Sequence, residues 1–101
     1  MKAPPFEYHA VSSLEEAVSL LGEYGDEAKV LAGGQSLVPL LALRLARPEH
    51  VIDINRVPGL QGIEELAGLR VGPLVRQREA ERSPTVAAAN PLLAAALPFI
   101  G

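Results

Sequence analysis

The stretch "AKVLAGGQSLVPLLALRLARPEHVIDIN", residues 28–55, places a helix-like run between two strand-like runs. The apolar run at 28–33 predicts a buried strand, and "HVIDIN" at 50–55 predicts another. Between them, residues 36–48 are apolar on nearly all sides, which predicts a buried helix with Pro39 in its first turn. A strand, a helix and a second strand in this order are typical of a parallel sheet with right-handed crossovers.

The residues before this stretch add one more strand and one more helix. "FEYHA" at 6–10 predicts a strand, and Ser12 and Glu15 have the spacing of a helix capping box. Gly25 suits the C-cap of the same helix. The apolar residues that follow the cap fall on one helical face: Leu14, Ala17, Val18 and Leu21.

The pattern changes after residue 60. "GIEELAGLRVGP" at 62–73 predicts a β-hairpin with its turn near Ala67-Gly68, and "LVRQREAERS" at 74–83 is polar and compatible with a helix. Ser83-Pro84 and Asn90-Pro91 each predict an N-cap followed by proline at the first helical position. The predicted fold is therefore α/β (α+β), with a small parallel βαβαβ sheet, a hairpin and short C-terminal helices in one domain.

Composition excludes several classes of function. The chain has 101 residues, 49% of them hydrophobic, and a net charge of -3 without a basic patch, which argues against nucleic acid as a partner. It has no cysteine, which excludes disulfides and cysteine-ligated metals and fits a cytoplasmic protein. The N-terminal residues lack the apolar core of a signal peptide, and no apolar run is long enough to span a membrane.

The loop Ala32-Gly33-Gly34-Gln35-Ser36 joins the second predicted strand to the second predicted helix. Glycines permit positive φ and remove the Cβ atoms that would keep a phosphate away from the backbone, and a helix N-terminus offers unpaired N–H groups. The alternative is a plain strand–helix turn in which Ser36 is an ordinary cap. The loop lacks both the three spaced glycines of the dinucleotide pattern and the lysine of a Walker loop, so the glycine pair taken alone favours the plain turn, and a phosphate loop stays open.

No catalytic or metal-binding set is predicted from the remaining polar residues. His9 and His50 have no acidic partner at a telling spacing, so we expect them at strand edges or on the surface. Asp53 and Asn55 alternate with isoleucines and should share one face of the sheet, where an exposed position or a turn cap is the favoured role. No serine–histidine–acid triad or carboxylate pair can be assembled.

In its longer context the glycine loop resembles one family. The run "VLAGGQSLVPLLALRLARPEHVIDINRVPGL" follows "PFEYHAVSSLEEAVSLL" and precedes a hairpin with a glycine motif and "RQREAERSPTVAAANPLLAAALPFI". This order is similar to that of the FAD-binding (medium) subunits of molybdenum hydroxylases, which include carbon monoxide dehydrogenase medium subunits and xanthine dehydrogenase flavin domains. The resemblance covers essentially the whole chain.

The resemblance implies a cofactor, a fold and a set of site residues. The cofactor is FAD, and the fold is the N-terminal subdomain of the vanillyl-alcohol-oxidase (PCMH-type) FAD-binding fold. Relatives tend to read isoleucine-glycine-alanine-leucine-threonine near the flavin, and Pro73 and Val75 depart from that pattern here. The residues implied to bind FAD are Ala32, Gly33, Gly34, Gln35, Ser36 and Leu37, which would hold the pyrophosphate, and Gly72, which would lie near the flavin.

The resemblance also implies a larger assembly. Relatives continue into a second glycine motif, a second FAD subdomain and a C-terminal domain, so residues 1–101 are expected to be a truncated N-terminal FAD-binding subdomain. The implied partners are a molybdopterin-containing large subunit and an iron–sulfur small subunit, with electrons passing from the clusters through FAD to an acceptor. Assembly of the chain into a homo-oligomer is a further possibility that the sequence leaves open.

Two other functions are left open by the sequence. Instead of being part of an FAD-dependent oxidoreductase, the chain is a fragment that docks onto a partner without binding FAD in the second hypothesis. A small binder of another phosphate ligand through the same loop is a third, weaker option.

Overall fold

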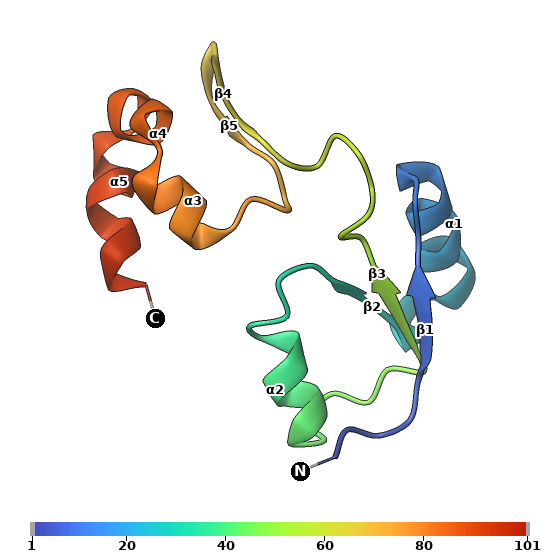
Figure 1. Ribbon diagram of the computed structural model, residues 1–101. Helices are drawn as coiled ribbons and strands as arrows, with labels where there is room; N and C mark the ends of the chain where they lie inside the picture. Colours follow the sequence, from blue (N-terminus) through green and yellow to red (C-terminus); the bar gives the residue numbers. More distant parts are fainter. Residues whose placement is uncertain (1, 101) are drawn as a thin grey trace. The chain divides into compact units, whose positions relative to one another are not determined.

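The computed structural model describes residues 2–100, which fall into two compact units (Figure 1). The first unit is Met1–Pro58 and the second is Gly59–Gly101. The boundary lies in "RVPGL", 56–60, where the sequence pattern changes.

The first unit is built on a three-stranded sheet of β1 (Glu7–Ala10), β2 (Ala28–Leu31) and β3 (His50–Asp53). All pairings are parallel and the strand order is β1-β3-β2, which confirms the predicted parallel sheet. In the register, His50 of β3 lies beside both Glu7 and Ala28. β2 and β3 each end two residues earlier than predicted.

The core of this unit surrounds β3, the central strand, whose first three residues are buried. Among residues 2–100, β2 pairs only with β3, so it is an edge strand. Lys29 and Val30 are exposed, and the prediction of a buried strand is wrong. The buried hydrophobic residues of the first unit are Val11, Ala17, Ala28, Leu41, Val51, Ile52, Ile54 and Val57.

The N-cap of helix α1 (Leu14–Tyr24) lies one residue later than the predicted cap, Ser12. The N-cap is Ser13, whose Oγ accepts from the N–H of Glu16 at 3.1 Å, while the Glu16 carboxylate accepts from the N–H of Ser12 at 3.3 Å. The predicted pairing of Ser12 with Glu15 is therefore wrong by one residue. Gly25 is confirmed as the C-cap, with φ of 52°, and it opens the 3-10 turn Gly25–Glu27.

Helix α2 (Leu37–Ala42) is shorter than the predicted run of 36–48. Arg44 adopts φ of 59°, its N–H donates to Leu41 O at 3.1 Å, and the N–H of Leu45 donates to Leu40 O at 2.9 Å. These are the two hydrogen bonds of a Schellman motif, which ends a helix and usually uses glycine. Because Arg44 takes the position that glycine usually has, the sequence contains no glycine signal for the end of this helix.

The expectation that α2 is buried is also wrong for the described residues. Only Leu41 of this helix is buried. The helix is short and packs with one side against a small sheet, so its other sides stay in contact with solvent. The large apolar residues of this segment that remain exposed are Val38, Leu40, Leu43 and Leu45.

The second unit contains a hairpin and short helices. Strands β4 (Ile63–Leu66) and β5 (Gly68–Val71) pair antiparallel around the predicted turn. Three helices follow, and the 3-10 turn Leu97–Phe99 ends the unit. The helices are α3 (Gln77–Arg82), α4 (Pro84–Ala89) and α5 (Pro91–Ala96).

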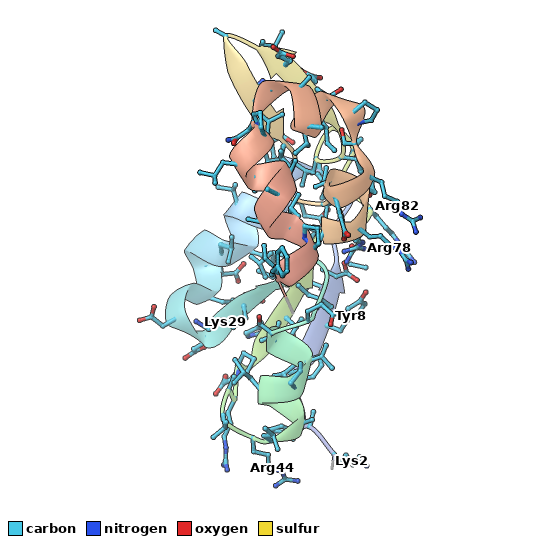
Figure 2. The ribbon with its side chains drawn as sticks, turned by 90° about the vertical axis from the view of Figure 1, so that its left-hand side faces the viewer. Lys2, Tyr8, Lys29, Arg44, Arg78 and Arg82 are labelled. Atoms are coloured by element: carbon cyan, nitrogen blue, oxygen red, sulfur yellow. The ribbon has the colours of Figure 1, made fainter. Side chains whose placement is uncertain are left out.

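The predicted helix caps of this unit are confirmed. Ser83 Oγ accepts from Val86 N–H at 3.2 Å, and Asn90 Oδ1 accepts from Leu93 N–H at 3.0 Å. The helices bury Ala80, Val86 and Leu97, against which residues of the hairpin pack. Arg78 and Arg82 of α3 extend outward (Figure 2), as expected for a solvated helix face. Among residues 2–100, no helix has the length and apolar character needed to cross a membrane.

Candidate functional site

The glycine loop leaves the end of β2 and enters α2 through a tight bend. Gly34 has φ of 80°, a conformation that side chains with a Cβ rarely adopt. A Cβ at this position would lie 3.0 Å from Val38 Cγ2 and 3.3 Å from Leu31 Cδ1. Gly34 is therefore required both by backbone conformation and by the close packing of strand and helix.

The same bend leaves a row of backbone donors without protein partners. Within residues 2–100, no protein acceptor is bound by the N–H groups of Gly33 through Leu37, and the first helical hydrogen bond runs from Val38 N to Gly34 O at 3.0 Å. Gly33, Gln35 and Ser36 are exposed, and the Ser36 side chain makes no capping hydrogen bond. The hydroxyl of Ser36 therefore does not have the ordinary cap role. A row of backbone N–H donors on exposed or half-buried residues can bind an anion.

A chain of side-chain hydrogen bonds holds the first residue of this loop. Asn55 Nδ2 donates to Ala32 O at 2.8 Å and to Asp53 Oδ1 at 2.7 Å, and Asn55 N–H donates to the same Oδ1 at 2.9 Å. The other carboxylate oxygen of Asp53 accepts from the hydroxyl of Tyr8, which β1 presents (Figure 2). Asp53 and Asn55 thus form a turn, as predicted, and they also anchor a loop that is 23 residues away in sequence.

The protonation states of Asp53 and Tyr8 in this chain of hydrogen bonds are fixed at neutral pH. Partial burial acts to raise the pKa of Asp53, but the hydrogen bonds from Tyr8 and Asn55 and the charge of Arg56 outweigh it, so the pKa is lowered. The hydrogen bond to Asp53 raises the pKa of Tyr8. Asp53 is therefore an ionised acceptor and Tyr8 a protonated donor.

Gly72 lies in the second unit and serves a close approach of two backbone segments. A Cβ there would lie 2.3 Å from Leu60 O, so no larger residue fits without a backbone shift. Its N–H donates to Gly62 O at 2.9 Å, and Leu74 N–H donates to Leu60 O at 2.9 Å. The N–H of Gly72 is thus already engaged, and the predicted contact with a cofactor would have to use other atoms of this residue.

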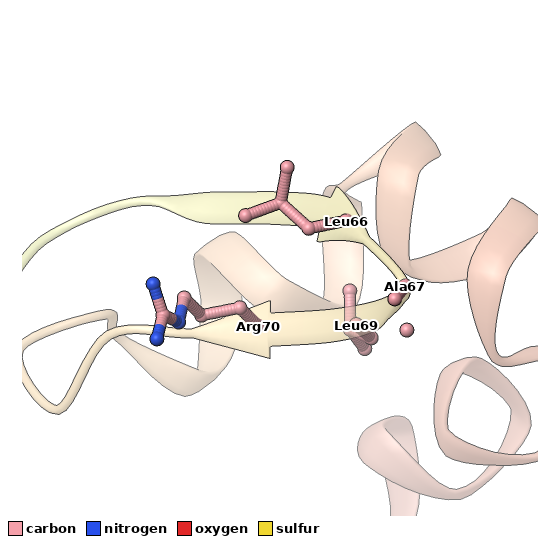
Figure 3. Close-up of a pocket in the computed structure, with 5 residues that line it drawn as sticks. Leu66, Ala67, Leu69 and Arg70 are labelled. Carbon is pink, nitrogen blue, oxygen red and sulfur yellow. The ribbon is translucent and has the colours of Figure 1, made fainter.

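Two shallow hollows are lined by residues outside the glycine loop. One surrounds the hairpin turn and is lined by Leu66, Ala67, Gly68, Leu69 and Arg70 (Figure 3). The other is a depression along α1, lined by Leu14, Glu15, Val18 and Ser19. Neither brings together groups for acid–base or nucleophilic chemistry.

The two histidines lie together, and His50 is buried on the central strand β3, so the prediction of a surface or strand-edge position is wrong for His50. His9 Nε2 is 3.0 Å from His50 Nδ1, and Glu7 Oε2 is 3.9 Å and 3.6 Å from these two nitrogens. Glu7 is therefore an acidic neighbour of both histidines, although the sequence shows no acidic partner at a telling spacing. Strand pairing across 41 residues creates this cluster, which spacing within one segment does not reveal.

A parallel α/β unit with unpaired backbone donors beyond a strand end has the architecture of nucleotide-binding α/β domains. The chain belongs to a family of such domains, the FAD binding domain in molybdopterin dehydrogenase, which it matches over residues 4–101. FAD is therefore the cofactor of its family.

The relatives agree with this assignment. The chain is 52% identical to the carbon monoxide dehydrogenase medium chain of Hydrogenophaga pseudoflava over 99% of its own length and 35% of that protein. It is 44% identical to the nicotine 6-hydroxylase medium subunit of Paenarthrobacter nicotinovorans, with 95% of this chain and 34% of that protein covered. The chain thus spans about a third of the length of these curated relatives.

Solved structures share the fold as well. The carbon monoxide dehydrogenase of Hydrogenophaga pseudoflava superposes with a TM-score of 0.93 at 51% identity, over the whole of this chain and 36% of that one. Quinoline 2-oxidoreductase from Pseudomonas putida 86 superposes with a TM-score of 0.91 at 40% identity, over the whole of this chain and 35% of that one.

Proposed function

We propose that the chain binds the diphosphate of FAD through the backbone N–H groups of Gly33 to Leu37. The observation that carries this proposal is the row of backbone N–H groups, Gly33 to Leu37, that bind no acceptor within residues 2–100, in a loop where Gly34 requires glycine. Ala32 would contribute by fixing the start of the loop, since its carbonyl is held by Asn55. Gln35 and Ser36 would add an amide and a hydroxyl donor to the phosphate oxygens.

The protein would bind and orient the cofactor rather than react with substrate. FAD supplies electron transfer when bound. The chain would place the diphosphate against the loop and hold the loop through Tyr8, Asp53 and Asn55. No side chain near the loop has the surroundings of a general acid or base.

We further propose that the chain acts within a medium subunit of a cytoplasmic molybdenum hydroxylase. A molybdopterin-containing large subunit and an iron–sulfur small subunit would be its partners, and electrons would pass from the clusters through FAD to an acceptor. This rests on the similarity to a carbon monoxide dehydrogenase medium chain and a nicotine 6-hydroxylase medium subunit. The absence of cysteine agrees with a reducing compartment.

A docking module that does not bind FAD by itself is the second candidate. The exposed apolar residues of the α2 segment favour it, because such a surface is typical of a protein contact. Docking would make these residues, rather than the glycine loop, the important ones.

Gly34→Asp tests the proposal against a matched control. Gly59 has φ of 82°, close to that of Gly34, and no atom lies within 4 Å of a Cβ built there. Gly59→Asp therefore adds the same charge at a similar backbone conformation, at a residue that belongs to the other unit. We expect Gly34→Asp to abolish FAD binding through steric block and charge repulsion, and Gly59→Asp to retain it. Equal affinity in the two variants, with both folded by circular dichroism, would contradict the proposal.

A further inference from the structure

The strand register of the first unit brings three metal-ligating side chains to one face of its sheet. Glu7 and His9 are two residues apart on β1, so their side chains point to the same face. His50 is the first residue of β3 and lies directly beside Glu7 in the parallel pairing. Glu7 and His50 are the first residues of their strands and His9 follows Glu7 by two residues, whereas the glycine loop follows the end of β2.

The ligand atoms of these residues are separated by distances that suit a metal ion. His9 Nε2 and His50 Nδ1 are 3.0 Å apart, and Glu7 Oε2 lies 3.6 Å from His50 Nδ1 and 3.9 Å from His9 Nε2. The point equidistant from three atoms with these separations is about 2 Å from each, which matches zinc–nitrogen and zinc–oxygen bond lengths. Two imidazole nitrogens and one carboxylate oxygen form a donor set typical of divalent transition metals.

Packing holds one of the two imidazoles in place. His50 is 9% exposed, and the ring of Tyr24 stacks on it with centroids 3.5 Å apart and planes 10° apart. The other two ligands are more accessible, since Glu7 is exposed and His9 is half-buried. A fixed buried ligand beside two accessible ones allows an ion to enter from solvent and leaves coordination positions for water.

We propose that Glu7, His9 and His50 bind one divalent transition-metal ion, with zinc as the probe. Without metal, one imidazole N–H donates to the other ring's nitrogen across the 3.0 Å separation. On binding, that hydrogen moves to the other nitrogen of its own ring, so that both facing nitrogens present lone pairs to the metal. Glu27, Glu49 and His50 form a second set of neighbouring ligand atoms, but it offers one imidazole and two exposed carboxylates, a poorer donor set for these metals.

The test is a calorimetric titration of the untagged full chain with Zn²⁺. The variants are Glu7→Gln and His9→Gln, which alter accessible ligands and leave the buried His50 in place. Glu49→Gln is the control for the second set of ligands, and Glu15→Gln is the control for an exposed glutamate outside both sets. A Co²⁺ titration followed by visible absorbance reports whether nitrogen ligands bind the ion.

We expect the wild-type chain to bind one Zn²⁺ per molecule and to shift the visible spectrum of Co²⁺. Glu7→Gln and His9→Gln should each weaken binding by at least about tenfold, since a lost ligand should cost no less than a lost outer-shell partner. Glu49→Gln and Glu15→Gln should bind like the wild type. Absence of saturable binding in the folded wild type, equal affinity in all variants, or loss only in Glu49→Gln would overturn the proposal.

Discussion

At the scale of single residues, the glycine loop combines one residue that the fold requires with neighbours that the fold does not use. Gly34 is required by its positive φ and by its contacts with Val38 and Leu31. Ser36, in contrast, is exposed and makes no capping hydrogen bond. Substitutions at these two positions should therefore separate stability from ligand binding.

Ser36→Ala should weaken FAD binding without destabilising the chain. A hydrogen bond to a charged group is worth about 1.5–3 kcal/mol, so we expect a loss of affinity of about tenfold to a hundredfold. The free energy of unfolding should stay within about 0.5 kcal/mol of the wild type, because an exposed hydroxyl without a cap bond is removed. Ser19→Ala, on the exposed side of α1, is the control for both measurements. Unchanged affinity would show that the Ser36 hydroxyl does not contact the ligand.

Asp53→Asn should destabilise the first unit in a pH-dependent way. The carboxylate accepts hydrogen bonds from Tyr8 and Asn55, and losing bonds to a charged group should cost about 1–2 kcal/mol at pH 7. Because the pKa of Asp53 is lowered in the folded state, this contribution is present at neutral pH and is lost as the pH falls below the usual value of about 4.

Urea unfolding of the wild type and Asp53→Asn at pH 7 and near pH 3 measures this effect. The difference between the two proteins should be larger at pH 7 and should narrow in acid. Asp26→Asn, in an exposed turn, is the control. The role assigned to the Asp53 charge includes its attraction to the nearby charge of Arg56. If the difference in free energy of unfolding between wild type and Asp53→Asn did not change with pH, this role would be contradicted.

At the scale of elements, the helix ends show how local hydrogen bonds decide boundaries. α1 is capped by Ser13, one residue beyond the predicted cap, and α2 is followed by Arg44, which has positive φ. Both boundaries rest on hydrogen bonds that single substitutions can remove or improve.

Ser13→Ala should destabilise the chain, whereas Ser12→Ala should not. The hydroxyl of Ser13 accepts from Glu16 N–H, and loss of such an N-cap costs about 1 kcal/mol. Ser12 contributes only its backbone N–H, which alanine retains. Thermal unfolding of the two variants measures the difference in stability. An equal loss of stability in both variants, or a larger loss in Ser12→Ala, would contradict the assignment of Ser13 as the N-cap.

Arg44→Gly should stabilise the chain slightly. Left-handed backbone costs a residue with a Cβ about 1–2 kcal/mol, and part of the gain is offset by the greater freedom of glycine in the unfolded state, so we expect up to about 1 kcal/mol. Arg47→Gly makes the same replacement at a residue without positive φ and should not stabilise. Denaturant midpoints measure both; a destabilised Arg44→Gly variant would contradict the Schellman motif.

The existence and order of the elements could be predicted from the sequence, because periodicity, proline and glycine report local structure. The hairpin turn near Gly68 and the caps at Ser83 and Asn90 are local signals of this kind, and the structure confirms them. The burial of α2 could not be predicted in the same way. Its sequence is apolar on nearly all sides, which predicts a buried helix, but only one side of it is covered by other residues.

The candidate site shows the same division between local and long-range information. The loop at Ala32–Ser36 could be found from its glycines, but its anchor at Asn55 and the pairing of His9 with His50 depend on contacts across the sheet. Such contacts leave no spacing signal in one segment of the chain, so only the structure reveals them.

At the scale of the whole molecule, the proposed function depends on the first unit, which carries the loop of unpaired donors. Gly72, the remaining residue predicted to bind FAD, lies in the second unit, and its glycine is explained by the approach of Leu60 O. The chain covers about a third of the length of its relatives. The part of the proposed FAD site that can be tested with this chain is therefore the glycine loop.

The most direct measurement is a titration of the purified chain with FAD, followed by flavin fluorescence and visible absorbance, with ADP as competitor. ADP carries the diphosphate without the isoalloxazine ring, so it reports on the loop alone. We predict saturable FAD binding that ADP displaces. Absence of binding in a sample that is folded by circular dichroism, or binding that ADP does not displace, would contradict the claim that this loop is a diphosphate site.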